Sequence, residues 1–234
     1  MRIGTFITLG SAEICEMLGN KLDFAVIDAE HGVILDFTVK SLLRSIPGNV
    51  TPWIRVKKPD MVSTALDLGA RAILVPQIRN MEELKEALDS FYYPPEGKRG
   101  WGPGRASRYG LDIMELIPKE KENELWIQIE TAEALDIVDK IAGKEGIYGL
   151  FVGPGDLSLA IGHPGEFDNP ELEKEIERIF NFCKGNSKKF GIFVGNAAKV
   201  KQWEEKGADV VILGADSSFF AEGFANAMKI AGRL

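Results

Sequence analysis

The chain has 234 residues, of which 45% are apolar and 27% charged, and its net charge is −7. This length suits one large core, and the acidic balance argues against nucleic acid or an anionic membrane as the main partner. No run of about 18 apolar residues predicts a transmembrane helix. The first residues lack the basic and apolar regions of a signal peptide, so we expect a cytoplasmic protein.

Eight short apolar segments, bounded by Gly, Asp or Pro, have the pattern of strands that are buried on both faces. In chain order they are Ile3–Leu9, Phe24–Glu30, Pro52–Val56, Ala72–Ile78, Leu125–Thr131, Tyr148–Gly153, Phe190–Gly195 and Asp209–Gly214. Helical patterns lie between or after them, at Ala12–Leu18, Met61–Leu68, Met81–Tyr92, Ala132–Ile141, Pro170–Cys183, Ala197–Lys206 and Ser217–Ile230. The alternation predicts a single (β/α)8 barrel over residues 1–234. A doubly wound open sheet is the competitor, but it usually has fewer strands and a Gly-rich first turn.

One connection, at about 93–124, is longer than the others and begins with YPPEGKRGWGPGRASRYG. It concentrates Lys98, Arg99, Arg105 and Arg108 in an otherwise acidic chain. Long insertions in compact domains are commonly lids or interface loops, although a solvated loop or a subunit contact explains the charges equally well. The two cysteines, Cys15 and Cys183, are far apart and are predicted to be buried free thiols.

Polar side chains recur at the carboxyl ends of five successive predicted strands. Active sites of such barrels lie at these ends, where a polar side chain is costly unless it is paired or used. The residues, in strand order, are Asp28, Glu30 and His31, then Arg55, then Gln77, then Gln128 and Glu130, and finally Asp156. Their convergence predicts an active site at this rim.

Glu130 and Asp156 follow neighbouring predicted strands, which lie about 4.8 Å apart. Two carboxylates this close repel each other unless they share a proton or a cation. A hard divalent ion held by two carboxylates is typical of Mg²⁺ or Mn²⁺. The alternative is a pair of strand-end acids that accept hydrogen bonds from backbone amides.

Three other side chains have the chemistry of a catalytic site. An aspartate beside an imidazole suits an acid/base pair, which points to Asp28 and His31. Arg55 needs an anionic partner, either a substrate oxygen or an internal salt bridge with Asp28 or Glu30. The glycines around Gly155 allow the backbone to approach a carboxylate at a helix start.

Several segments together resemble the HpcH/HpaI aldolase family, the metal-dependent (class II) pyruvate aldolases. They are FAVIDAEHG, WIRV, LDLGARAILVPQI, YPPEGKRGWGPGRAS, WIQIET and FVGPGDLS, in order from about Asp23 to Ile161. The resemblance implies a TIM barrel of the phosphoenolpyruvate/pyruvate type. It also implies a homohexamer, a trimer of dimers in which the last helix packs on a neighbouring subunit.

The resemblance also implies a role for each matching residue. Glu130 and Asp156 would bind Mg²⁺, Mn²⁺ or Co²⁺, and His31 with Asp28 would be the acid/base dyad. Arg55 would stabilise the enolate oxygen. Pyruvate would be held by Gln128 and by the backbone amides of Gly155 and Asp156. The expected reaction is cleavage of a 4-hydroxy-2-oxo acid to pyruvate and an aldehyde, and its reverse.

The sequence departs from the family pattern at two places, and three alternative functions stay open. Gly155 stands where alanine is commoner, and Lys57 and Lys58 follow Arg55 where less basic residues are usual. A Schiff-base aldolase would use Lys57. An acyl-CoA lyase of the same superfamily would hold its nucleotide on the loop Lys98–Arg108, and a non-catalytic barrel would only bind an oxo acid.

Overall fold

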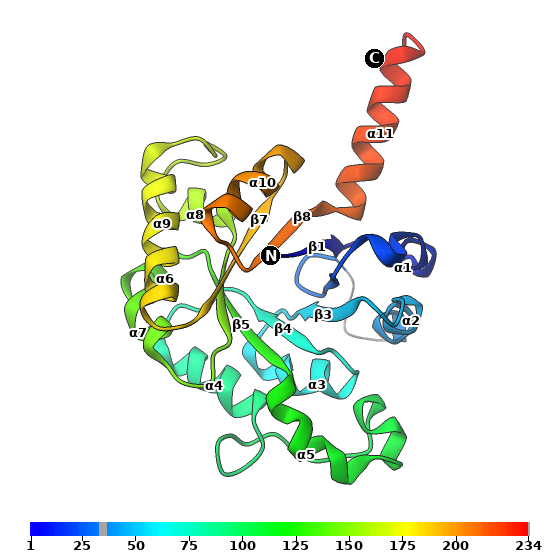
Figure 1. Ribbon diagram of the computed structural model, residues 1–234, viewed down its shortest axis with the longest axis vertical. Helices are drawn as coiled ribbons and strands as arrows, with labels where there is room; N and C mark the ends of the chain where they lie inside the picture. The colour runs from blue at the N-terminus through cyan, green and yellow to red at the C-terminus, as the bar shows by residue number, and fades with distance from the viewer. Residues whose placement is uncertain (33–36, 234) are drawn as a thin grey trace.

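The computed structural model describes residues 1–32 and 37–233. Eight parallel strands close a barrel in chain order, and β8 pairs with β1 to complete it (Figure 1). This confirms the predicted (β/α)8 fold. The strands are β1 Arg2–Ile7, β2 Phe24–Asp28, β3 Thr51–Arg55, β4 Ala72–Val75, β5 Glu124–Ile129, β6 Gly149–Val152, β7 Lys189–Val194 and β8 Val210–Ala215.

The helices surround this barrel and begin at side-chain caps in several cases. Asn80, Asn169 and Asn196 each accept backbone N–H bonds at the first turn of the following helix. The helices are α1 Ala12–Leu18, α2 Phe37–Ser45, α3 Val62–Asp67, α4 Met81–Phe91, α5 Leu116–Lys119, α6 Ala132–Asp136, α7 Val138–Gly143, α8 Pro154–Ala160, α9 Pro170–Gly185, α10 Ala197–Lys206 and α11 Asp216–Ile230. Of the helices that the structure describes, none has the length and apolar character needed to cross a membrane.

Stacked aromatic rings fill the interior of the barrel. The ring centroids of Phe24 and Trp53 lie 4.5 Å apart, and those of Trp53 and Trp126 lie 5.3 Å apart. Gly149, on the strand next to Trp126, leaves the space that this indole occupies, because a Cβ there would overlap the ring. The two thiols, Cys15 and Cys183, are buried and free, as predicted.

The insertion joins α4 to β5, and therefore lies at the amino-terminal end of the barrel. Arg105 donates to the carbonyls of Leu43 and Leu68, at the ends of α2 and α3, at 3.3 Å each. Arg99 is buried and forms a 2.7 Å ion pair with Asp67. These contacts tie the insertion to the base of the barrel, so it does not cover the strand ends where the site was predicted.

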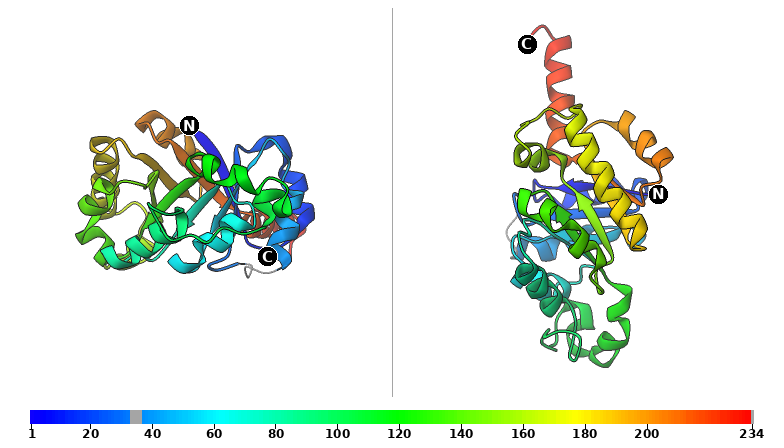
Figure 2. Two further views of the ribbon diagram at one scale, coloured as in Figure 1. Left: turned by 90° about the horizontal axis from the view of Figure 1, so that it is seen from below. Right: turned by 90° about the vertical axis from the view of Figure 1, so that its left-hand side faces the viewer.

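The last helix, α11, projects from the barrel at the end of the molecule opposite the insertion (Figures 1 and 2). Its first residue, Asp216, is its one buried residue, and accepts hydrogen bonds from the backbone N–H groups of Thr8 and Leu9. The aromatic side chains Phe219, Phe220 and Phe224 are exposed by 43 to 70%. The start of α11 is thus held against the barrel, and most of the side chains after it are exposed to solvent.

Candidate active site

The ends of β2 and β3 carry a buried ion pair. Asp28 and Arg55 are register partners, and the guanidinium binds the carboxylate in a bidentate manner at 2.9 and 2.8 Å. Nη1 of Arg55 also lies 3.3 Å from Oε2 of Glu30. A guanidinium has five N–H donors, so these three contacts leave two N–H groups for a further acceptor. The internal salt bridge weighed from the sequence is present, and it leaves Arg55 able to bind a substrate oxygen.

The charges of this cluster are unbalanced because several acids converge on one arginine. Burial raises the pKa of Glu30 to about 7, Arg55 opposes the rise, and Glu130, Asp28 and Asp156 add to it. Burial alone would lower the pKa of Arg55, but its hydrogen bond and ion pairs with Asp28 and Glu30 raise it instead. The guanidinium therefore stays charged, whereas Glu30 can exchange a proton near neutral pH.

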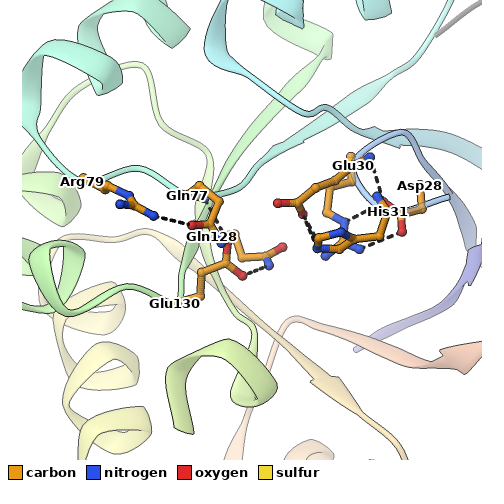
Figure 3. Close-up of polar contacts among 8 residues, drawn as sticks. Asp28, Glu30, His31, Gln77, Arg79, Gln128 and Glu130 are labelled. Carbon is orange, nitrogen blue, oxygen red and sulfur yellow. Dashed lines mark hydrogen bonds and ion pairs between the residues drawn. The ribbon is translucent and has the colours of Figure 1, made fainter. Parts of the chain in front are cut away.

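His31 stands at the mouth of the barrel, and its side chain is 65% exposed. Its Nε2 lies 3.6 Å from Oε2 of Glu30 (Figure 3). Asp28 reaches His31 only through the backbone: its Oδ1 accepts from the N–H groups of Glu30 at 3.1 Å and His31 at 3.4 Å. Such a turn is typical of aspartate, and together with Arg55 it occupies the carboxylate. The carboxylate that faces the imidazole is thus that of Glu30, which differs from the expected ring contact with Asp28.

Glu130 directly follows β5, and two hydrogen bonds from Gln77, which follows β4, hold its carboxylate in place. Its Oε1 accepts two hydrogen bonds from Gln77, one from the backbone N–H at 2.9 Å and one from Nε2 at 3.0 Å. Gln77 has a positive φ of 55°, which turns both donors toward one oxygen. Oε1 of Gln77 accepts in turn from Arg79 at 3.1 Å (Figure 3). A strained residue of this kind at a strand end indicates a functional constraint.

The other oxygen of Glu130, Oε2, faces the neighbouring strands. It accepts a hydrogen bond from Nε2 of Gln128, whose own Oε1 is buried and has no hydrogen-bond partner among the described residues. Gly153 lies beside this pair, because a Cβ there would come within 3.0 Å of both Gln128 Nε2 and Glu130 Oε2. The close approach of β5 and the end of β6 thus depends on glycine at this position.

Asp156 lies in the first turn of α8, directly beyond β6, and is exposed. Burial raises the pKa of Glu130, hydrogen bonds from Gln128 and Gln77 oppose this, and the charge of Asp156 adds to the rise. The charge of Asp156 is therefore close enough to act on the carboxyl group of Glu130. Gly155 has open space where a Cβ would stand, so an alanine would fit there.

Comparison with known proteins identifies the family. The family model described as HpcH/HpaI aldolase/citrate lyase matches residues 2–223. The chain belongs to this family. It is 34% identical over 225 residues to the 5-keto-4-deoxy-D-glucarate aldolase of Escherichia coli O6:H1 (strain CFT073), a match that covers 94% of this chain and 88% of that one.

Solved structures of family members have the same architecture. An HpcH/HpaI aldolase/citrate lyase family protein from Burkholderia cenocepacia J2315 has a TM-score of 0.90 and 30% identity, covering 98% of this chain and 94% of that chain. A citrate lyase beta subunit from M. tuberculosis, complexed with oxaloacetate and magnesium, has a TM-score of 0.62. It is 13% identical and covers 93% of this chain and 92% of that chain, so the likeness concerns the fold alone. The family and its named relatives support a lyase that acts on small molecules.

The residues of this family member fit a divalent cation. Glu130 is buried and its pKa is raised, and the charge of Asp156 adds to that rise. A positive charge between the two carboxylates would therefore relieve their electrostatic repulsion. Their oxygens are the hard donors that Mg²⁺ and Mn²⁺ prefer, and the unpartnered Oε1 of Gln128 could accept a hydrogen bond from a water on the ion. The described residues contain no group of three or more His, Cys, Asp or Glu suited to a metal.

Two residues gain importance that the sequence pattern did not assign. Glu30 and Gln77 were visible as polar residues at strand ends, but nothing in the pattern tied Glu30 to His31 or Gln77 to Glu130. Lys57 is exposed, whereas a Schiff-base lysine needs a desolvated site to be reactive. His163 lies between Glu166 and Glu171 at 3.4 and 3.2 Å.

Proposed function

We propose that the protein is a metal-dependent class II aldolase, which cleaves a 4-hydroxy-2-oxo acid to pyruvate and an aldehyde and catalyses the reverse addition. The observation that carries this proposal is the buried Glu130, whose pKa is raised and which is clamped at one oxygen beside the charge of Asp156. Two carboxylates whose charges act on each other in this way are relieved by a shared cation or a shared proton, and we propose the cation. A citrate lyase beta subunit with this fold is complexed with magnesium, in keeping with the proposal.

A divalent cation held by Glu130 and Asp156 would act as a Lewis acid toward the 2-oxo acid. The remaining work falls to side chains of the chain itself. The exposed imidazole of His31 accepts the proton of the 4-hydroxyl group as the bond between C3 and C4 breaks, and Glu30 at 3.6 Å stabilises the imidazolium. Negative charge develops on the 2-oxo oxygen, where the two unused N–H groups of Arg55 stabilise it. The imidazolium of His31 then returns this proton to C3, directly or through a water molecule, which gives pyruvate and restores the neutral imidazole.

The substrate is held at two places in this proposal. Gln128 and the backbone amides of Gly155 and Asp156, at the start of α8, bind the carboxylate of the oxo acid. The relative from E. coli acts on 5-keto-4-deoxy-D-glucarate, which has an acid group at each end. In this proposal the exposed Lys57, two residues after Arg55, binds an acid group on the aldehyde half. We therefore propose an acidic aldehyde as the second product.

The test compares Glu130→Gln with the wild type in two assays. Pyruvate release from 4-hydroxy-2-oxo acids, followed through lactate dehydrogenase, should require Mg²⁺ or Mn²⁺ and should fall at least about a hundredfold in the variant. Mn²⁺ binding, measured by electron paramagnetic resonance, should weaken in parallel. Turnover that survives both chelation and Glu130→Gln would refute the proposal. Lys174→Gln, an exposed site on α9, is the control for a single charge change.

We also propose that the protein assembles into a homo-oligomer through α11, in line with the hexamer that the family resemblance implies. The support is the row of exposed phenylalanines on a helix that touches its own barrel only at its start. Exposed apolar surface of this kind usually marks an interaction site.

The acyl-CoA lyase is the second candidate, since the family model includes citrate lyases. An acyl-CoA lyase was expected to bind its nucleotide on the basic insertion. That insertion is bound to the base of the barrel, at the opposite end from Glu130. Assays with malyl and citramalyl thioesters separate the two candidates, and we expect no turnover of either.

A further inference from the structure

A cavity of about 610 Å³ lies at the base of the barrel between the insertion and the ends of α2 and α3. Six cationic side chains line it, and no acidic side chain is found in the described part of its wall. They are Arg44, Arg71, Arg99, Arg105, Arg108 and Lys119. The wall of this cavity is therefore positively charged, although the chain as a whole has a net charge of −7.

Two of these cations have no carboxylate partner in the part of the chain that the structure describes. Arg44 donates to the phenol oxygen of Tyr109 at 3.2 Å, and Arg105 donates to two backbone carbonyls. Gly69 has no Cβ that would block the guanidinium of Arg105, so the arginine lies against the backbone there. Their positive charges are thus compensated only by neutral acceptors, which leaves both able to bind an anion.

The other cations are paired, but their partners lie outside the cavity wall. Arg71 binds Glu122 at 2.8 Å as a pair of exposed side chains, and the exposed Arg108 binds the half-buried Asp112 at 3.2 Å. Pairs of this kind contribute little stability, so an anionic ligand can compete for the guanidinium groups. Arg99 is 3% exposed, and its Nε–H is buried without a hydrogen-bond partner.

We propose that this basal cavity is a binding site for a small phosphorylated molecule, separate from the catalytic mouth of the barrel. Planar guanidinium groups match the oxygens of a phosphoryl group, and several of them gathered around one cavity are typical of phosphate recognition. The volume is in the range of small-molecule sites. Leu111, Leu116 and the ring of Tyr109 supply an apolar wall for the rest of such a ligand.

The probe is inorganic pyrophosphate, titrated into chelator-treated protein by isothermal calorimetry at low ionic strength. Chelation removes any metal at the barrel mouth, so binding there through a cation is excluded. We expect one saturable site per chain. Arg44→Gln should weaken binding about tenfold, the loss of one hydrogen bond to a charged group. Adding Arg71→Gln should weaken it further.

The matched control is Arg233→Gln, which removes the same charge beyond the end of α11, at the other end of the molecule (Figure 1). It should bind pyrophosphate as the wild type does. Absence of a saturable site, or equal affinity of Arg44→Gln and the wild type, overturns the proposal. Equal weakening by Arg233→Gln overturns it as well, because the attraction would then come from overall charge. The aldolase assay is independent of all three outcomes.

Discussion

Gln77 offers the sharpest test of how the acidic site is built, because its backbone and side chain act on the same oxygen of Glu130. Its φ of 55° is in the left-handed region, which costs a residue with a Cβ about 1 kcal/mol. Its Nε2 donates to the carboxylate at 3.0 Å, and a hydrogen bond to a charged group is worth about 1.5–3 kcal/mol. Gln77→Ala should therefore lose the bond and keep the strain.

Gln77→Gly is the matched variant, because it loses the same bond but relieves the strained backbone and keeps the N–H donor. In urea unfolding we expect the glycine variant to be more stable than the alanine variant by about 1 kcal/mol, with both below the wild type. Their affinity for Mn²⁺ should fall by a similar factor, about tenfold, because both lose the side chain that orients Glu130. Equal stability of the two variants would show that the positive φ stores no strain. Unchanged Mn²⁺ affinity would show that the clamp does not position the carboxylate.

Three further predictions follow from the described contacts. The pKa of Glu30 is raised from 4.5 to about 7 by burial, so metal-free protein should lose stability as the pH rises from about 4.5 to 7, by roughly 3 kcal/mol, and no more above that range. Glu30→Gln should reduce this slope in urea unfolding at pH 5 and pH 8, while the raised pKa of Glu130 maintains part of it, and a slope equal to that of the wild type would contradict the assignment. Gly153→Ala should weaken both Mn²⁺ binding and turnover, because the added methyl group displaces Gln128 and Glu130. Gly155→Ala should leave both unchanged, because a Cβ there meets open space. Equal Mn²⁺ affinity and turnover of the two variants would count against the packing argument. Replacing both Phe220 and Phe224 by Ser should reduce the mass measured by sedimentation, and an unaltered mass would exclude α11 as the subunit contact.

Much of the barrel could be predicted because burial on both faces leaves a clear local pattern. Every predicted strand overlaps an observed one, with ends that differ by at most three residues. The helices were predicted less well: α2 and α8 were not singled out, and the segment Ala132–Ile141 forms two helices because Ile137 has a non-helical backbone.

The positions of the site residues could be predicted from their place at strand ends, but their partners could not. Parallel strands bring their carboxyl ends to one rim, which placed Asp28, Arg55 and Glu130 together. The choice of Glu30 rather than Asp28 as the neighbour of His31 depends on a backbone turn that withdraws one carboxylate. The grip of Gln77 on Glu130 depends on a positive φ at a residue that rarely has one. Neither the turn at Asp28 nor the positive φ of Gln77 can be predicted from the order of apolar and polar residues.

The packed aromatic rings within the barrel have a consequence for any ligand bound at its base. Phe24, Trp53 and Trp126 are fully buried, and their rings pack against one another inside the barrel. A molecule bound by Arg44 at the base would affect the candidate active site around Glu130 by shifting the strands that pack against these rings. Interiors packed this tightly transmit displacement with little compression. The indoles of Trp53 and Trp126 would sense such a shift directly, and their fluorescence would report it.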